Sequence, residues 1–206
     1  MVARREPQMT VEEFLALDRE NLDQKYEFRN GQMVAMAGGS NNHTLIIGNI
    51  HAAIHTHIRK SPCAVYSEGT LKVEDECYMP DIMVTCNEQD LTESKTYIEY
   101  PKLVIEVLSP NTDKYDRTDK MWLYTQCRSI QEYILVEWDM IIVQRMTRKG
   151  TGELDWFQWI DRRYYQDESV ELETIGLSIP VDDVYEKVIL PPPDPFRGFK
   201  RRKNNS

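Results

Sequence analysis

Residues 102–110 read Lys102-Leu103-Val104-Ile105-Glu106-Val107-Leu108-Ser109-Pro110, an almost unbroken apolar run with one acid inside it. A short apolar run that stops at a turn signal predicts a central strand, buried on both faces of a sheet. The alternation of side chains along a strand puts Glu106 on the same face as Val104 and Leu108. Because burying an unpaired carboxylate is costly, Glu106 needs a buried partner or a metal ion.

The segments before and after this strand predict further strands and helices. Thr10-Val11-Glu12-Glu13 is a capping box that opens a short helix. Asn30-Gly31, between two short alternating segments, is the strongest short signal for a hairpin. Two longer helices are expected, over about residues 43–60 and 115–127. Further strands are expected near residues 64–66, 70–73, 82–86, 132–138, 141–146, 153–160 and 170–177.

This order, with strands grouped around two helices, predicts an α/β fold of the α+β type, in which helices flank a central mixed sheet. A chain of 206 residues is long enough for one domain with a real core and short for two. We expect that domain to span residues 1–192. The tail at residues 193–206 contains five basic residues and is expected to be disordered.

The charge and hydropathy of the chain argue against some classes of protein. A composition of 41% hydrophobic and 29% charged residues is ordinary for a soluble globular protein. No apolar run is long enough to span a membrane, and the charged N-terminus lacks the apolar region of a secretion signal, so we expect a cytoplasmic protein. The net charge of −9 counts against a nucleic-acid partner, although acids clustered around a metal ion could account for part of it.

The four cysteines, Cys63, Cys77, Cys86 and Cys127, are scattered along the chain and contain no Cys-x-x-Cys pair. This spacing argues against a zinc knuckle and against a disulfide scaffold. It fits a reducing compartment such as the cytoplasm.

A second acid, Asp81, follows Pro80 and opens the apolar run Ile82-Met83-Val84. Two carboxylates that project from neighbouring strands, Asp81 and Glu106, make a hard-oxygen site suited to Mg²⁺, for which Mn²⁺ can substitute. Such an ion binds a scissile phosphate and activates an attacking water. The alternative interpretations are a turn acid at a strand start for Asp81, and for Glu106 a buried acid satisfied by the backbone or by Arg117.

A lysine near the two acids would orient the water or stabilise the phosphorus centre. The usual nuclease pattern has this lysine two residues after the glutamate, where this chain has Leu108. The next helix instead has Asp116, Lys120 and Tyr124 at i, i+4 spacing, so that all three share one face. If this helix packs on the sheet, Lys120 reaches the carboxylates and Asp116 is its natural partner. The alternative is an ordinary surface lysine.

Two further residues are candidates for a supporting role. Glu27 lies in the first hairpin strand, where it could bind the metal ion or pair with Lys120; the alternative is a plain edge-strand glutamate. His43 lies near the N-terminal end of its helix, on the side that faces the core. A capping or core histidine is the alternative to a functional one.

Together these segments resemble a known family. In order, they are Tyr26-Glu27-Phe28-x-x-Gly31, His43 at the start of a helix, Pro80-Asp81-Ile82, Glu106-Val107-Leu108-Ser109-Pro110, Asp116-Arg117-x-x-Lys120-x-x-x-Tyr124 and Glu132-Tyr133-x-Leu135-Val136. The pattern, which spans about residues 10–160, is similar to the Uma-two (Uma2) family of the restriction-endonuclease-like PD-(D/E)xK superfamily. Departures are modest: Asn111 follows Pro110 where a small hydroxyl residue is common, and Phe28 and Arg29 replace a more aliphatic and acidic pair.

The resemblance implies a restriction-endonuclease-like core in which Asp81 and Glu106 bind the metal ion and Lys120 is the displaced lysine. The first hypothesis is therefore a Mg²⁺-dependent endonuclease that hydrolyses phosphodiester bonds, with DNA as the expected partner. A homodimer is conceivable, because cutting both strands of a duplex requires two sites. The second hypothesis is a non-catalytic binding or assembly module with the same fold. The acidic body of the chain favours this alternative, and the intact trio of Asp81, Glu106 and Lys120 disfavours it.

Overall fold

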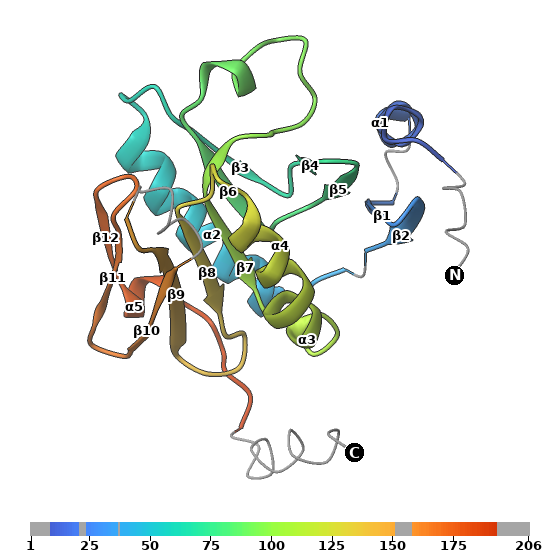
Figure 1. Ribbon diagram of the computed structural model, residues 1–206. Coiled ribbons are helices and arrows are strands. Elements are labelled where there is room, and N and C mark those ends of the chain that lie inside the picture. The colour runs from blue at the N-terminus through green and yellow to red at the C-terminus, as the bar shows by residue number, and fades with distance from the viewer. Residues whose placement is uncertain (1–8, 21–23, 37, 151–157, 193–206) are drawn as a thin grey trace.

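A computed structural model describes residues 9–20, 24–36, 38–150 and 158–192 of the chain. Its centre is a six-stranded mixed sheet with the strand order β10-β9-β8-β7-β6-β3 (Figure 1). Strands β7 and β8 are parallel, and the other neighbours are antiparallel. The bounds are β3 Ala64–Ser67, β6 Ile82–Thr85, β7 Pro101–Val107, β8 Glu132–Val136, β9 Ile142–Arg148 and β10 Trp159–Tyr165. The apolar run around Glu106 is thus a central strand, as predicted.

Helices cover both faces of this sheet. Helix α2 (Asn41–Ile58), capped by Ser40, packs Ile46, Ile50, Ile54 and Ile58 against one face. The other face is covered by a helix that consists of α3 (Asp113–Tyr115), a π-helical segment (Asp116–Lys120) and α4 (Met121–Gln126). Tyr124 from α4 contacts the ring of Tyr133 on β8, with ring centroids 5.3 Å apart. The α/β class with a flanked mixed sheet is therefore confirmed.

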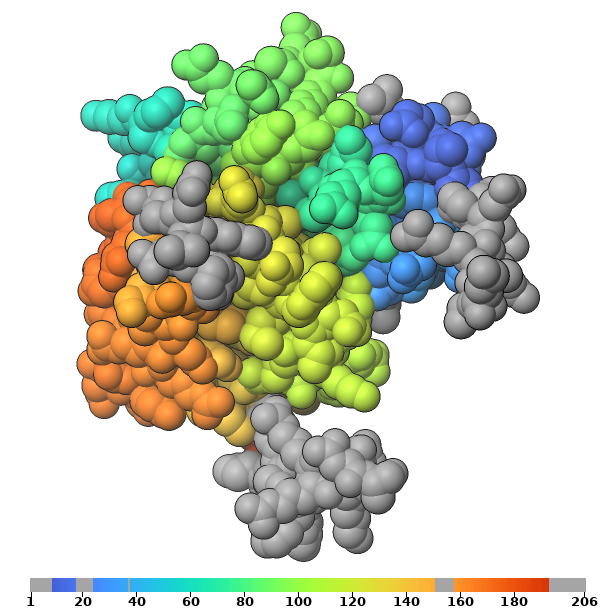
Figure 2. Space-filling model, in the orientation of Figure 1, coloured from blue at the N-terminus to red at the C-terminus, as the bar shows by residue number. Residues whose placement is uncertain are grey.

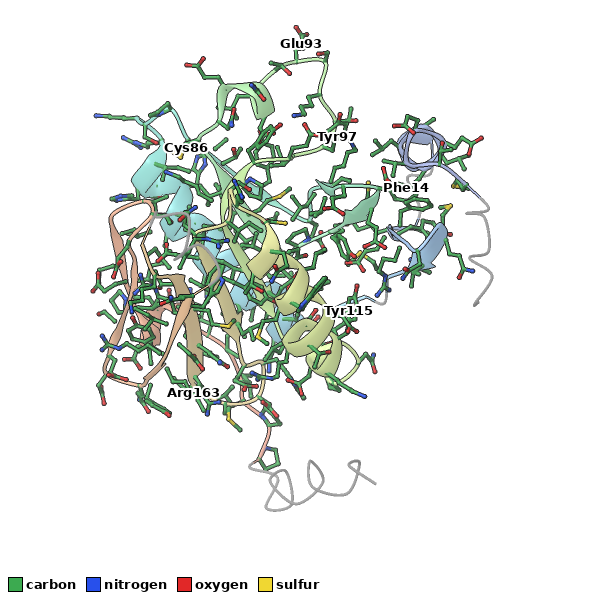
Figure 3. The ribbon with its side chains drawn as sticks, viewed as in Figure 1. Phe14, Cys86, Glu93, Tyr97, Tyr115 and Arg163 are labelled. Atoms are coloured by element: carbon green, nitrogen blue, oxygen red, sulfur yellow. A yellow bond between two sulfur atoms is a disulfide. The ribbon has the colours of Figure 1, made fainter. Side chains whose placement is uncertain are left out.

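The N-terminal part of the chain forms a smaller unit beside this sheet. Helix α1 (Val11–Glu20) precedes a four-stranded sheet of order β2-β1-β5-β4. A small core joins helix α1 to this sheet, and in it the ring of Phe14, which is labelled in Figure 3, stacks on that of Phe28 with centroids 5.3 Å apart. The strands are β1 Tyr26–Arg29, β2 Gln32–Ala35, β4 Leu71–Val73 and β5 Glu76–Tyr78.

The capping box and the first hairpin have the predicted structure. The backbone N–H of Glu13 donates to the Thr10 hydroxyl, and the Thr10 N–H donates to the Glu13 carboxylate. Asn30 and Gly31 both have positive φ, 51° and 74°, as a tight hairpin turn requires.

The C-terminal elements pack on the α2 side of the sheet. They are β11 (Ser169–Leu172), β12 (Leu177–Pro180) and the short helix α5 (Val181–Val184). Glu132, which is fully buried, holds them to the sheet because its carboxylate accepts from Arg145 and from the backbone N–H groups of Glu173 and Thr174. Among the residues that the structure describes, no helix is both long and apolar enough to cross a membrane.

Some details differ from the sequence predictions. Strand β5 was not anticipated, because its first residue, Glu76, belongs to a polar stretch that resembles a turn; the reversal of the chain is confined to Glu74 and Asp75. The strand predicted near residues 153–160 falls partly outside the described residues, and β10 begins only at Trp159. The expected tail at residues 193–206 lies outside them entirely.

A disulfide joins Cys63 and Cys86, which their spacing of 23 residues gave no reason to expect. The sequence argued against a disulfide scaffold, and for this pair the expectation of unpaired cysteines is wrong. The physical reason is the register of the sheet. Ala64 pairs with Thr85 across β3 and β6, so that the cysteines just beyond these two residues face one another. Cys77 and Cys127 are the two cysteines outside this disulfide.

Thiol titration tests this bond. Denatured, non-reduced protein should show two reactive thiols per chain, Cys77 and Cys127, and four after reduction. In native protein both should react slowly at neutral pH, because Cys77 is buried and burial raises the pKa of Cys127 to about 11. Cys63→Ser is the control and should show three thiols without reduction. Four thiols in the non-reduced wild type would contradict the disulfide.

Candidate active site

Asp81, Glu106, Asp116, Lys120 and His43 line one pocket of about 390 Å³. The pocket lies where β7 ends, β6 begins and α2 starts. In Figure 3, Tyr115 of α3 lies near the end of the sheet that holds the pocket, and Glu93 lies in a loop at the opposite end. The residues that the sequence singled out therefore meet in space, although they span much of the chain.

Strand pairing sets the two carboxylates of Asp81 and Glu106 side by side. Ile82 pairs with Ile105, which places Asp81 opposite Glu106. The Asp81 N–H donates to Glu106 Oε2 at 3.3 Å, and the Val107 N–H donates to Asp81 Oδ2 at 2.7 Å. Each carboxylate is thus fixed by the backbone beside the other. Both residues are buried, at 8% and 2% exposure.

Lys120 reaches the same point from the helix and contacts three carboxylates. Its Nζ lies 3.0 Å from Glu106 Oε1, 3.1 Å from Glu27 Oε1 and 3.5 Å from Asp116 Oδ1. Burial alone would lower the pKa of Lys120, but the charges of these carboxylates outweigh it and hold the pKa well above its ordinary value. Lys120 is therefore a buried cation and not a surface lysine.

At Glu106, in contrast to Lys120, the effect of burial on the pKa outweighs the effect of the opposite charge. Burial raises its pKa well above the ordinary value, Lys120 opposes this shift, and the neighbouring Asp116 and Asp81 add to it. The Tyr124 hydroxyl donates a further hydrogen bond to Glu106 Oε1 at 3.2 Å. Arg117, the alternative partner considered for Glu106, instead bonds Asp113 at 2.6 Å and Glu137. The helix residue that pairs with Glu106 is therefore Lys120 and not Arg117.

Asp116 contributes a buried oxygen, Oδ1, that has no hydrogen-bond partner among the residues that the structure describes. Its Oδ1 lies 3.5 Å from Lys120 Nζ, which is an ion pair without hydrogen-bond geometry. Burial raises the pKa of Asp116. The Tyr133 hydroxyl donates to the Asp116 carbonyl at 3.0 Å and fixes the π-helical segment on the sheet. π-Helical turns often occur at functional sites, and this one contains both Asp116 and Lys120.

His43 lies in the first turn of α2, and its Nε2 is 3.3 Å from Asp81 Oδ2. Burial lowers the pKa of His43, but the hydrogen bond and the charge of Asp81 outweigh burial, so the net shift is upward. The ring packs directly on Gly39, where a Cβ would come within 2.5 Å of the ring Nδ1. Glycine at position 39 thus allows His43 to approach Asp81.

Glu27 enters the site from the smaller sheet and pairs with Lys120, one of the two roles considered for it. Its Oε1 also accepts from the Met79 N–H at 3.3 Å, and its Oε2 pairs with Arg29 at 3.3 Å. The Arg29 guanidinium lies 4.3 Å from the centre of the Tyr115 ring. No role was predicted for Arg29, Tyr115 or Tyr133, because their link to the site depends on how the two sheets pack.

The donor set fits a divalent cation of the Mg²⁺ type. Within the described parts of the chain, no three acid, histidine or cysteine side chains already form a closed set of ligands. Mg²⁺ does not need one, because it usually binds one or two carboxylates and keeps several waters. Asp81 and Glu106 face an open pocket, and the unpaired oxygen of Asp116 is a further acceptor for a bound water.

Comparison with known proteins identifies the family of this chain. The sequence profile of Uma2, described as "Putative restriction endonuclease", matches residues 11–182. The chain belongs to the Uma2 family. Among its relatives is the Synechocystis sp. protein slr1290, described as uncharacterized, which is 33% identical over 183 residues, or 87% of this chain and 92% of the relative. A second Synechocystis protein, sll1609, is 30% identical over 133 residues, or 63% of this chain and 75% of that one.

A solved structure shows the same fold. It is described as a putative nuclease belonging to DUF820 from Anabaena variabilis, and it superposes with a TM-score of 0.70 at 17% sequence identity. The match covers 88% of this chain and 99% of that structure. The Uma2 resemblance and the nuclease-type fold inferred from the sequence motifs are thus confirmed.

Proposed function

We propose that this Uma2 chain is a Mg²⁺-dependent endonuclease that hydrolyses phosphodiester bonds in DNA. One observation supports this proposal above all. A buried ammonium, Lys120, and two carboxylates from adjacent strands, Asp81 and Glu106, converge on one open pocket. Burying such a cluster destabilises a protein unless the charges are used or compensated, so a purely structural origin is a poor explanation.

Asp81 and Glu106 are the proposed ligands of the metal ion. When bound, Mg²⁺ would supply a Lewis acid that activates water and neutralises charge on the scissile phosphate. His43 holds one oxygen of Asp81, and the Val107 N–H also donates to that oxygen, so the other oxygen is directed to the pocket. These contacts orient Asp81 before any substrate arrives, and such preorganisation is the main protein contribution at sites of this type.

Lys120 acts in this proposal as a fixed positive charge. Its raised pKa keeps it protonated at neutral pH, so it donates hydrogen bonds and does not accept a proton. Glu27 and Asp116 hold the ammonium beside Glu106, at the place where negative charge grows on the phosphate oxygens. Asp116 Oδ1, which has no hydrogen-bond partner, is positioned to accept from a water in the pocket.

Removing and restoring the metal ion tests the proposal. Protein dialysed against EDTA should leave single-stranded circular DNA intact, and added Mg²⁺ or Mn²⁺ should restore its cleavage. Calorimetric titration of the dialysed protein with Mn²⁺ should show binding. Cleavage that persists in EDTA would contradict the metal requirement. No cleavage of DNA with either ion, together with no heat of Mn²⁺ binding, would favour the non-catalytic module instead.

A further inference from the structure

The pocket has a buried floor and an exposed rim. On the floor, the side chains of Lys120, Glu106 and Asp116 are only 3–5% exposed, and those of Asp81 and His43 are 12–13% exposed. On the rim, Lys25 and Glu68 form an ion pair, and their side chains are 49% and 48% exposed. A substrate phosphate must therefore pass the rim before it reaches the acids.

The rim pair joins the two sheets of the protein across the pocket. Lys25 directly precedes β1, and Glu68 lies in the loop between β3 and β4. The backbone of Glu68 has a φ of 51°, and its N–H donates to the Asp81 carbonyl at 3.1 Å. This hydrogen bond fixes the rim to Asp81, the residue directly before β6. A strand that enters the pocket on the side of Lys25 and Glu68 must pass beside this pair or displace it.

The charge around the pocket is poorly suited to a duplex. Of the described side chains that line it, Lys25, Lys120 and His43 are basic, and each already faces a carboxylate. Proteins that hold duplex DNA commonly neutralise about 6–10 phosphates with basic side chains. This rim has one exposed lysine, and Glu68 offsets its charge.

The shape of the pocket leads to the same conclusion. A volume of about 390 Å³ is near the lower end of small-molecule sites, roughly 300–1,000 Å³. A duplex is stiff, with a persistence length of about 50 nm, and cannot bend one phosphate into a pocket without a cost in free energy. A single strand is flexible enough to lower one phosphate group onto the floor while its neighbours stay on the rim.

Resting on the proposed function, we infer that the substrate is single-stranded at the scissile phosphate and enters past the Lys25–Glu68 pair. The strand makes only one or two phosphate contacts with the rim, and the phosphate that descends to Asp81 and Glu106 is the one that is cut. Glu68 then limits affinity, because its carboxylate repels the strand and occupies the lysine that would otherwise bind it.

Binding to a matched pair of DNA ligands tests this inference. The full chain is titrated, with Ca²⁺ in place of Mg²⁺, against a short labelled single strand and against the same strand in a duplex, and anisotropy is measured. We expect the single strand to bind at least about tenfold more tightly. Its logarithmic salt dependence should have a slope of about −1, as one or two phosphate contacts give.

The outcomes separate this inference from the proposed function. Equal or tighter binding of the duplex, or no binding of either ligand, would overturn the single-strand inference. Metal-dependent cleavage, measured separately, decides whether the chain is a nuclease. A protein that cuts duplex DNA readily with Mg²⁺ would thus remain a nuclease and lose its assignment to single strands.

A second exposed ion pair, Glu186–Lys187, provides a matched control for the Lys25–Glu68 pair. Glu68→Gln removes the carboxylate from the rim and frees Lys25, so single-strand binding should tighten by about fivefold. Glu186→Gln breaks a comparable exposed pair, with Lys187, and should leave binding unchanged. If the two variants respond alike, or if Glu68→Gln weakens binding, the strand does not enter past the Lys25–Glu68 pair.

Discussion

Glu106→Gln should lower the rate of Mg²⁺-dependent DNA cleavage by about 10³-fold, since a bound metal ion contributes several kcal/mol to such reactions. Glutamine keeps the shape of the side chain, and its amide oxygen can still accept from the Tyr124 hydroxyl at the Oε1 position, whereas the amide nitrogen that replaces Oε2 cannot accept from the Asp81 N–H. It loses the negative charge that would hold the cation. Single-turnover cleavage with excess enzyme measures the rate, and calorimetry should show Mn²⁺ binding weakened in the same variant.

Tyr124→Phe is the matched control for this change. It removes a hydrogen bond of 3.2 Å to Glu106 and leaves the carboxylate charged, so cleavage should fall by about tenfold at most. The melting temperature of Glu106→Gln should be unchanged or higher, because one buried anion is gone. Wild-type cleavage by Glu106→Gln would exclude Glu106 from the chemistry and return the acid to a structural role.

Lys120→Met should destabilise the fold by about 3–5 kcal/mol and also abolish cleavage. Methionine fills much of the same volume but leaves the carboxylates of Glu27, Glu106 and Asp116 buried without the ammonium that links them. These acids must then take up protons or draw water into the site. Urea unfolding measured at neutral pH gives the loss in free energy.

Two further variants identify the cause of that loss. Lys187→Met changes a lysine whose side chain is 81% exposed and should alter stability by less than about 0.5 kcal/mol. Adding Asp116→Asn to Lys120→Met removes one of the stranded anions and should recover part of the lost stability. Lys120→Met with wild-type stability would mean that Lys120 does not hold the acids together in solution.

The sequence predicted the main sheet and most of the site because those features have local signals. The acid inside an apolar strand identified Glu106, and the Asn30-Gly31 turn identified the first hairpin. Asp116 and Lys120 were grouped correctly, because i, i+4 spacing on a helix is visible in the sequence alone. The convergence of these residues at the sheet followed from the assumption that the helix packs back on β7.

Features that depend on long-range pairing could not be predicted. Strand β5 begins at a polar residue and becomes a strand through its pairing with β4 and β1. The Cys63–Cys86 bond depends on the register of β3 against β6, which no motif encodes. The sequence left open whether Glu27 binds the metal ion or pairs with Lys120, because that depends on how the smaller sheet packs beside the larger one.

Helix α1 and strand β1 share a small core of their own, whereas β4 and β5 pack Leu71 and Tyr78 into a core of the larger sheet. Figure 2 shows the N-terminal residues as a lobe at one side of the molecule, next to the helix that contains Lys120. Only a few apolar residues around Phe14 and Phe28 hold this lobe together, whereas extended apolar clusters cover both faces of the larger sheet. Local unfolding follows contact density, so the hairpin should open and reclose while the sheet that holds Asp81 and Glu106 stays intact. Each opening would break the Glu27–Lys120 and Lys25–Glu68 ion pairs, and each closing would form them again. Local opening of the N-terminal lobe would therefore change the lining of the pocket.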